Sequence, residues 1–363
     1  MKFQFLSIII LTILVASCKK EDVKSPSPPV ETASYFPPLS GSSWETVTPA
    51  SLGWNETELA NLYTYLQQKD TRAFIILKNG KIVSEKYFGT FTADSIWYWA
   101  SAGKTMTAML VGIAQEEGKL NIGDRSSKYL GTGWTSLTPV QENLITIRHQ
   151  ITMTTGLDDN VLPDNDCTSP SCLVYKADAG TRWAYHNAPY TLLDKVVETA
   201  TSASYNSYFQ QKIRDRIGMN GLWIKTGYNN VYYSNPRSMA RFGLLLLNKG
   251  KWDQSVILGD TAYLYSQRNT SQNYNLSYGY LTWLNGKSTY MLPTLQTVFS
   301  GPMIPTAPAD LYAALGKNDQ KIYMVPSQKL VVIRMGNSAG NVMLAASSFD
   351  TELWGKLKNI IGY

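Results

Sequence analysis

The segment WASAGKTM, Trp99 to Met106, contains residue types that fit two different kinds of chemistry. Its ending G-K-T matches the end of a phosphate-binding loop, whereas Ser101 and Lys104 have the spacing of a serine activated by a lysine. A complete phosphate-binding loop, G-x-x-x-x-G-K-[ST], needs a glycine five residues before Gly103, and that position is Tyr98. One glycine cannot supply the cradle of backbone N–H groups that phosphates require, so the phosphate-binding interpretation fails.

The serine and the lysine are placed so that they could work together. Ser101 and Lys104 are three residues apart at the start of a predicted helix, and side chains at this spacing share one face. A serine hydroxyl is a weak nucleophile and needs an adjacent base. The free N–H groups of the helix N-terminus can also face a developing oxyanion. The segment therefore predicts acyl-transfer chemistry.

A second cluster lies in GTRWAYHNAPYTLL, which contains Tyr185, His186 and Asn187. In an extended segment alternate side chains project to the same side, so Tyr185 and Asn187 could face a cleft while His186 points away. A phenol has an ordinary pKa of about 10. A nearby lysine cation favours the phenolate, which could then accept the serine proton. His186 itself is interpreted as a spacer whose imidazole hydrogen-bonds the backbone.

A further serine motif, GNSAG from Gly336 to Gly340, matches the nucleophile elbow G-x-S-x-G. In the fold that uses this elbow, the histidine follows the serine along the chain. Here both histidines, His149 and His186, precede Ser338. The motif is therefore interpreted as a glycine-rich turn into the last helix, and His149 as a structural histidine on a helix.

Hydrophobic periodicity predicts where the helices and strands lie. Apolar residues at helical spacing predict helices from Asn55 to Gln68, from Ser101 to Gly118, through the middle of the chain and at the C-terminus. Two β-rich runs around Asn79-Gly80 predict a hairpin, and strand signals return only late, in YGYLTWL, DLYAAL, KIYMV and KLVVIRM. This order predicts an α/β (α+β) fold with an antiparallel sheet built from both termini, flanked by helices, and an inserted mainly helical lobe.

The N-terminal residues predict export. Met1 and Lys2 precede an apolar run that is too short to span a bilayer comfortably and ends in small residues. V-A-S-C resembles the lipobox of bacterial lipoproteins, which implies removal of residues 1–17 and lipidation of Cys18; the alternative is an ordinary secretory signal with a chance cysteine. Residues 18–45 are rich in Pro, Ser and Thr and are expected to form a flexible tether. The expected location is the outer membrane, through a lipid anchor, on the periplasmic side or at the cell surface.

Composition limits the remaining function classes. The chain has 363 residues, of which 44% are hydrophobic and 17% are charged, so residues 46–363 suffice for one large domain or for two closely packed lobes. The net charge of +6 is spread along the chain, whereas nucleic-acid binding would need a clustered basic surface. Cys167 and Cys172 remain as a pair that could form a small disulfide loop in an exported chain. A zinc site would need two more ligands, so no metal or other cofactor is expected.

Together the motifs resemble those of the β-lactamase-related serine hydrolases, in the superfamily of class C β-lactamases and DD-peptidases. The resemblance covers about residues 46 to 363. SAGK resembles the S-x-x-K motif of that family, and YHN resembles its Y-x-N motif. ITIRHQITMTTGL resembles the segment between them that ends in T-S-G-L, and SMARFGLLLLNKGKW resembles the helix and loop that follow. Four matches in the family's order are more specific than any single one.

The resemblance implies a role for each motif. Ser101 would be the acylated nucleophile, Lys104 its hydrogen-bonded partner, and Tyr185 the general base that later protonates the leaving group. The oxyanion hole would combine the Ser101 N–H with that of an edge-strand residue, identified as Ala314 by its distance from Val325-Pro326.

The resemblance and the residues also suggest what contacts the substrate. Asn187 is expected to bind a substrate carbonyl or to hold Lys104. Aromatic residues that flank the motifs could line an apolar acyl or sugar site, although core packing is the default interpretation of each: Trp97, Trp99, Trp183 and Tyr190.

The chain departs from the family at its third motif, K-T-G or H-x-G, because the strand reads DLYAALGKNDQKIYMVP. In this it resembles the branch of esterases and 6-aminohexanoate-oligomer hydrolases. In that family the missing cation binds a substrate carboxylate. Lys317 either replaces this cation in part or is a solvated turn lysine. The expected function is hydrolysis of a small ester, amide or peptide. The alternatives are a penicillin-binding-type DD-peptidase or β-lactamase, and a non-catalytic ligand-binding member of the family.

Overall fold

The computed structural model describes Met1 and residues 34–161, 165–340 and 346–363. Ser34–Tyr363 forms one compact unit, separate from Met1–Ala33, and contains every helix and strand of the described residues. The predicted signal peptide, the predicted lipidation site Cys18 and the tether up to residue 33 lie outside the described residues.

Strands lie near both ends of the domain and most helices lie in its middle, as expected from the sequence. The helices are α1 (Glu56–Gln68), α2 (Gly103–Glu116), α3 (Ser127–Leu130), α4 (Pro139–Glu142), α5 (Ile147–Ile151), α6 (Asn187–Thr191), α7 (Leu193–Thr201), α8 (Tyr205–Phe209), α9 (Pro236–Leu247), α10 (Thr261–Gln267) and α11 (Ser348–Ile361). The strands are β1 (Thr71–Lys78), β2 (Lys81–Tyr87), β3 (Trp97–Tyr98), β4 (Leu222–Thr226), β5 (Asn229–Ser234), β6 (Lys251–Trp252), β7 (Ser255–Val256), β8 (Trp283–Leu284), β9 (Thr289–Tyr290), β10 (Phe299–Ser300), β11 (Tyr312–Gly316), β12 (Gln320–Val325) and β13 (Leu330–Gly336).

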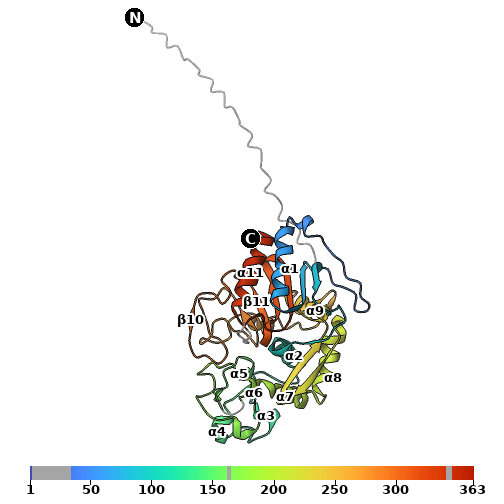
Figure 1. Cartoon of the computed structure of the whole chain (residues 1–363). Coiled ribbons are helices and arrows are strands. Elements are labelled where there is room, and N and C mark those ends of the chain that lie inside the picture. Colours follow the sequence, from blue (N-terminus) through green and yellow to red (C-terminus); the bar gives the residue numbers. More distant parts are fainter. Residues whose placement is uncertain (2–33, 162–164, 341–345) are drawn as a thin grey trace. The chain divides into compact units, whose positions relative to one another are not determined.

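The main sheet is built from both ends of the chain, as predicted. Among the described residues its strand order is β2-β1-β13-β12-β11-β8, and every neighbouring pair is antiparallel. Helices α1 and α11 lie side by side at the sheet, whereas α9 packs against β1, β12 and β13 (Figure 1). Helices α3 to α6 lie at the other end of the domain, with α2 between them and the sheet (Figure 1).

Local sequence signals account for the first elements. Asn55 caps α1 by accepting a hydrogen bond from the Glu58 N–H, and the three leucines of the predicted stripe are buried. The β1–β2 turn has positive φ at Asn79 (51°) and Gly80 (84°), the conformation that matches the twist of a two-residue hairpin. The predicted helix and hairpin are therefore both confirmed.

Helix α2 is the central helix of the domain. Every side chain from Gly103 to Ala114 is buried, so this helix has no polar face turned to water over that length. It packs against β11 of the sheet and against α7 of the helical lobe. Consequently any polar group on its first turns is held in an apolar environment.

The middle of the chain differs from the prediction because it also contains strands. Strands β3, β5 and β4 form a second antiparallel sheet, in the segments around WYW and NGLWIKTGYNNVYYSN. The alternating burial along β5 shows the period of two that marks a half-buried strand. Short strands of this kind carry a weak signal next to long apolar helices, and the sequence analysis missed them.

The predicted tether, residues 18–45, is too long at its C-terminal end. The Tyr35 N–H donates to the Asn79 carbonyl at 3.0 Å, and the Trp44 indole donates to the Gly80 carbonyl at 2.7 Å. Phe36 packs on Trp252 with ring centroids 5.2 Å apart. These aromatic side chains bury enough apolar surface to fix the segment on the domain, although its surroundings are rich in Pro and Ser.

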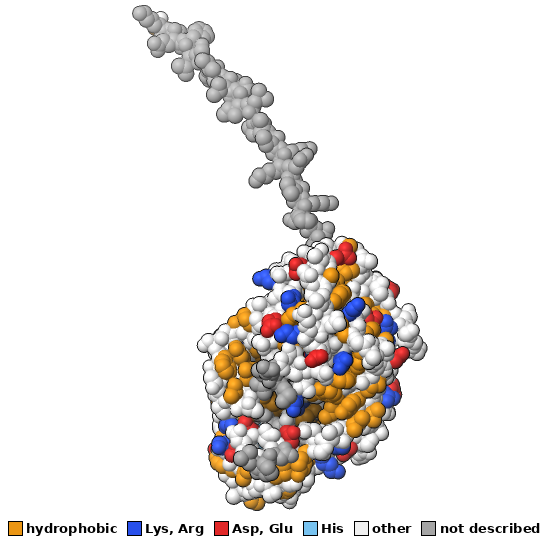
Figure 2. Space-filling view, viewed as in Figure 1, with side chains coloured by type: hydrophobic (Ala, Val, Ile, Leu, Met, Phe, Trp, Pro, Cys, Tyr) orange, Lys and Arg blue, Asp and Glu red, His pale blue; other side chains and the backbone are white. Residues whose placement is uncertain are grey.

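On the face shown in Figure 2, charged side chains are dispersed, with basic side chains interspersed among acidic ones. In the described part of the chain no helix has both the length and the apolar composition needed to cross a bilayer. Cys167 and Cys172 are joined by a disulfide with Cα atoms 5.9 Å apart, as the pairing of the cysteines suggested.

Replacing Trp44 with alanine tests the attachment of the N-terminal segment. Trp44 is 8% exposed, and the Arg241 guanidinium lies 5.3 Å from its ring. We expect Trp44→Ala to lower the free energy of unfolding by about 3–5 kcal/mol, measured by urea denaturation, because it leaves a cavity and an unpaired carbonyl. Leu39→Ala, at a side chain that is 53% exposed, serves as the control and should change stability little. Equal effects of the two variants would contradict this attachment.

Candidate active site

Ser101 and Lys104 are brought together as the sequence predicted. Ser101 lies in a short 3-10 helix, Ala100–Ala102, that leads directly into α2. The Lys104 Nζ lies 3.1 Å from the Ser101 Oγ, within hydrogen-bond distance. Ala100 has φ of 47°, an unfavourable value for a residue with a side chain, so the chain turns sharply just before the serine.

The Lys104 ammonium lies among aromatic rings. It is 4.0 Å from the centroid of the Tyr190 ring and 5.4 Å from that of Tyr185, and the residue is only 4% exposed. Burial lowers the pKa of Lys104 to about 7, and the Asp166 carboxylate opposes this shift by favouring the charged form. The amine is therefore poised to lose its proton near neutral pH.

Tyr185 completes the predicted group of three. Its ring stacks on Trp283 of β8 with centroids 5.7 Å apart and meets Tyr278 edge-on at 6.2 Å. This packing joins the helical lobe to the edge of the main sheet and fixes the direction of the phenol. Burial raises the pKa of Tyr185 well above its ordinary value, and the hydrogen bond to the Ser101 side chain lowers it only in part. The phenol therefore remains protonated at neutral pH.

Ser101 and Lys104 line a pocket of about 230 Å³, whereas Tyr185, which contacts both of them, is not among the residues that line it. Residues of β4 and β5 form one wall, and the other lining side chains include Asp166, Asn187, Tyr190 and Lys317. Asn187 is the first residue of α6, and its Nδ2 donates to the Asp166 carboxylate at 2.7 Å. A serine, an amine, an amide and a carboxylate thus meet at one concave surface.

The two histidines lie where the sequence analysis expected. His186 is buried, its pKa is lowered to about 4 mainly by burial, and it hydrogen-bonds the backbone of Asn165. It is therefore neutral at pH 7. His149 lies on the short helix α5, where its Nδ1 accepts from the Thr146 N–H at 3.1 Å. Neither histidine lines the pocket.

The strand next to Ser101 corrects the prediction of Ala314. The Leu311 carbonyl accepts from the Asn285 N–H, so the backbone N–H and carbonyl of Leu311 point toward the β8 edge. Because these directions alternate along a strand, the backbone groups of the other odd-numbered residues of β11 point the same way. Ala314 has the opposite parity and pairs with Ile322 of β12. Its N–H therefore belongs to the sheet ladder and cannot face the pocket.

Gly316 of β11 lies directly against the backbone around the serine. A Cβ atom at Gly316 would lie 2.5 Å from the Trp99 carbonyl oxygen and 3.1 Å from the Ser101 nitrogen. The backbone of Gly316 is also extended, so the direction of the backbone groups keeps alternating along the chain. The next N–H directed toward the β8 edge is therefore that of Lys317. The Lys317 side chain is exposed and lines the pocket mouth. This position is compatible both with a partial substitute for the missing cation and with a solvated turn lysine.

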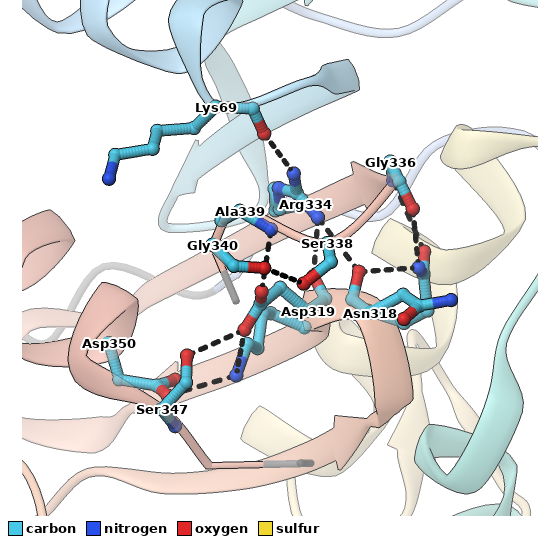
Figure 3. A network of polar contacts seen from close by, with 12 residues as sticks. Lys69, Asn318, Asp319, Arg334, Gly336, Ser338, Ala339, Gly340, Ser347 and Asp350 are labelled. Atoms are coloured by element: carbon cyan, nitrogen blue, oxygen red, sulfur yellow. Dashed lines mark hydrogen bonds and ion pairs between the residues drawn. The ribbon is translucent and has the colours of Figure 1, made fainter. Parts of the chain in front are cut away.

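A buried polar network holds the turn that follows Gly316 (Figure 3). The Arg334 guanidinium donates to the carbonyls of Asn318 and Asp319, each at 3.0 Å, and to that of Lys69 at 2.6 Å. Asn318 and Asp319 have φ of 60° and 57°, which costs free energy unless the surroundings enforce it. The network therefore fixes the turn whose first residue, Lys317, faces the pocket.

Asp319 connects this turn to the C-terminal segment. Its carboxylate accepts from the Ala339 N–H at 2.9 Å and from the Ser347 hydroxyl at 2.7 Å, and it pairs with Lys321 at 3.1 Å (Figure 3). Ala339 belongs to the GNSAG segment, so that segment supports the turn through its backbone. The Ser338 hydroxyl is bonded to the Gly340 carbonyl at 2.7 Å on the exposed side, as a turn residue would be.

The aromatic residues that flank the motifs divide between the core and the pocket. Trp99 and Trp183 are buried in the core, as the default interpretation expected, whereas Tyr190 lines the pocket. Asp166 and Asn229 also line it, but neither was predicted. The sequence signal for Asp166 was its position next to Cys167, which has meaning only once the disulfide loop is placed. In the described part of the chain no group of His, Cys, Asp or Glu side chains could hold a metal ion.

Comparison with known proteins shows the family of the chain. The sequence profile of the Beta-lactamase family matches residues 64–351. A beta-lactamase of Escherichia coli is 27% identical over 139 residues, which is 37% of this chain and 36% of that protein, so the chain matches well under half of this relative.

Solved structures show the same fold. A protein of Bacillus anthracis provisionally assigned as a 6-aminohexanoate-dimer hydrolase superposes with a TM-score of 0.64 at 19% identity, over 82% of this chain and 80% of that one. A protein of Bacteroides dorei provisionally assigned as a beta-lactamase gives a TM-score of 0.67 at 16% identity, over 85% and 100%. At these identities the likeness concerns the fold.

Replacing Gly316 tests the close approach of β11 to the serine. We expect Gly316→Ala to reduce the rate at which Ser101 reacts with a fluorophosphonate by about 10²-fold or more, because the added Cβ meets backbone atoms that cannot move aside. The matched control is Gly340→Ala, where no atom of the described residues lies within 4 Å of the added atom. Reaction of both variants at the wild-type rate would show that the contact with Gly316 does not shape the site.

Proposed function

The chain belongs to the beta-lactamase family, and from this premise we propose that it is a serine hydrolase that cleaves an ester or amide through an acyl-enzyme on Ser101. The observation that carries the proposal is the contact of 3.1 Å between Ser101 and a buried lysine amine at the wall of a pocket. A solvated lysine would stay charged, whereas this amine can accept the serine proton near neutral pH.

The pKa of Lys104 is lowered and that of Tyr185 is raised, and the proposed order of proton transfers follows from these opposite shifts. The resemblance implied Tyr185 as the base, but burial disfavours its phenolate and favours the neutral amine of Lys104. We therefore assign the first proton transfer to Lys104, as Ser101 attacks the carbonyl carbon. The Tyr185 phenol then protonates the leaving group, and the Lys104 ammonium returns a proton to Tyr185. Water releases the acyl group by the same steps in reverse.

The oxyanion formed by this attack needs two donors. The Ser101 N–H is at the start of a helix, where the first N–H groups lack acceptors within the helix. We propose the N–H of Lys317, a residue that follows Gly316 and lines the same pocket, as the second donor in place of that of Ala314. Both are backbone groups on packed elements, which suits them to stabilise developing charge.

A penicillin-binding-type peptidase or β-lactamase is the second candidate. Ala314, Leu315 and Gly316 occupy the strand on which the K-T-G motif was expected, so the motif's cation is missing there. Lys317, at the pocket mouth, is the nearest substitute for a group that grips a substrate carboxylate. A third candidate, a non-catalytic binding protein, gains little support, because a binding site has no need of a buried amine beside a serine.

The location of the protein is also a proposal. Export and lipid anchoring through Cys18 follow from the N-terminal sequence, and the disulfide between Cys167 and Cys172 supports an oxidising compartment. The membrane would then be a partner only through the anchor. The substrate would be a small ester, amide or peptide.

Covalent labelling tests the nucleophile. We expect a fluorophosphonate to label the wild-type protein once per chain and Ser101→Ala not at all, because that variant lacks the attacking oxygen. Ser338→Ala, the serine of the GNSAG turn, is the matched control and should be labelled like the wild type. Labelling of Ser101→Ala would refute the proposal, and labelling of the wild type by a penicillin as well would favour the second candidate.

The pH dependence of labelling separates the two possible bases. Fluoride leaves without needing a proton, so the labelling rate reports only the activation of Ser101. Because the pKa of Lys104 is about 7, the rate should fall about tenfold per pH unit below pH 7 and level off above it. Tyr185→Phe should keep this inflection, with a plateau within about tenfold of the wild type. Loss of the inflection in that variant would assign the base to Tyr185 instead.

A further inference from the structure

A second pocket lies between residues 39–44 and the start of α9. Its volume is about 310 Å³, compared with about 230 Å³ for the pocket at Ser101, and the two pockets share no lining residue. Residues 218–220, which follow the short 3-10 helix Asp215–Ile217, form a further wall. Clefts of this size hold small organic molecules, and the chemistry of the lining decides which ligand it suits.

Two arginines on one face of α9 line this pocket. Arg237 is paired with Glu85 through two hydrogen bonds, at 2.6 and 2.7 Å. Arg241, which is 5% exposed, donates to the carbonyls of Ile217 at 2.8 Å and Pro38 at 2.7 Å, and among the described residues it has no carboxylate partner. Neutral carbonyls do not cancel its charge, and a guanidinium has more N–H donors than these two bonds use. Arg241 therefore brings an uncompensated positive charge to the pocket.

Two asparagines add neutral donors. The Asn220 Oδ1 accepts from the Asn235 N–H at 3.1 Å, and the Asn235 side chain caps α9 by accepting from the Ser238 N–H at 2.9 Å. A backbone N–H only donates, so the amide atom that faces it must be the oxygen, and the NH₂ group lies on the other side. Neither NH₂ group donates to another described residue. Because both asparagines line the pocket, these donors are available to a ligand.

The charges around the pocket favour an anion. Arg241 stays charged at neutral pH, because burial and the neighbouring Arg237 lower its pKa only to about 10. Asp94 is the one carboxylate among the described residues that line the pocket, and it is exposed. Water and salt screen an exposed charge more than a buried one, so the attraction by Arg241 outweighs the repulsion by Asp94.

We propose that this pocket binds a small polar organic anion, of the kind of a sugar acid or a sugar phosphate. Charge-assisted hydrogen bonds from a guanidinium to a carboxylate or phosphate are among the strongest in proteins. The amides of Asn220 and Asn235 and the hydroxyls of Ser42 and Ser43 suit the hydroxyl groups of such a ligand. The volume of the pocket also exceeds that of an inorganic anion. This binding site is separate from Ser101 and does not depend on the proposed hydrolase activity.

Titration calorimetry of the protein at low ionic strength tests the proposal with four probes. D-Glucuronate and D-glucose 6-phosphate carry an anionic group on a sugar, D-glucose has the sugar alone, and inorganic phosphate has the anion alone. We expect at least one sugar anion to bind with a Kd below about 1 mM, about tenfold or more tighter than glucose and inorganic phosphate. The tighter of the two sugar anions identifies the group as carboxylate or phosphate. Absence of binding by both up to about 10 mM, or equal affinity for glucose or inorganic phosphate, would overturn the proposal.

Asn235→Asp tests where the ligand binds. Asp caps a helix about as well as Asn, so α9 should keep its cap, but the NH₂ donor becomes a charged acceptor. We expect this variant to bind the sugar anion about tenfold or more weakly. The matched control is Asn55→Asp, because Asn55 caps α1 in the same way outside the pocket and should leave the affinity unchanged. Thermal unfolding of both variants checks that the fold is intact.

Asp94→Asn tests the sign of the ligand's charge. Removing this carboxylate should leave the affinity for the sugar anion equal to that of the wild type or raise it by a few-fold, because one repelling charge is lost. Weaker binding in Asp94→Asn would contradict an anion site. Wild-type affinity in Asn235→Asp, or an equal loss in Asn55→Asp, would show that the ligand binds elsewhere and would also refute the proposal.

Discussion

The candidate site depends on the burial of one amine. Lys104 lies on the first turn of a helix that is enclosed along most of its length, so its charge has aromatic faces and a hydroxyl nearby in place of water. Removing an ammonium from water is costly, and a shift of the pKa is how proteins usually reduce that cost. The same helix packing that stabilises the domain therefore prepares the amine for proton transfer.

Two other buried cations of the domain, Arg334 and Lys321, differ from Lys104 because they have carbonyl or carboxylate partners. Arg334 donates to backbone carbonyls on several sides, and Lys321 pairs with both Asp319 and Asp350. The partners of these groups replace the water lost on burial, and removal of any partner would leave a buried charge uncompensated. Their effect is conformational: they hold a turn with two residues at positive φ against the N-terminus of α2. Stability and the geometry of the candidate oxyanion hole are thus linked through one network.

The site lies where three separate parts of the chain meet. Ser101 and Lys104 come from the central helix, Tyr185 and Asn187 from the helical lobe, and Gly316 from a late strand of the main sheet. The Tyr185 ring bridges lobe and sheet by stacking on Trp283. The contacts between these three parts are long-range in sequence, so the pocket exists only when the whole domain is folded, and its polar character depends on a loop closed by a disulfide.

The sequence by itself determined the elements whose signals are local. The cap at Asn55, the Asn79-Gly80 turn and the helix after Ser101 were all predictable, because each depends on neighbours a few residues away. The pair Ser101 and Lys104 and the order of motifs were enough to expect Tyr185 in the same site. The short strands of the middle sheet and the attachment of Tyr35 and Trp44 were missed, since packing rather than composition decides them.

Only the tertiary structure decided the remaining chemistry. Backbone groups of alternate residues of β11 point toward β8, so the register of these two strands decides which residue faces the serine. For that reason the structure favours Gly316 and Lys317 over the predicted Ala314. Whether lysine or tyrosine gives up its proton first depends on how much water each loses, which spacing cannot reveal. The orientation of Asn187 depends on Asp166, a residue that a disulfide places beside it. Pairing parity, desolvation and long-range hydrogen bonds arise only from the folded chain, and for that reason they were not encoded in any motif.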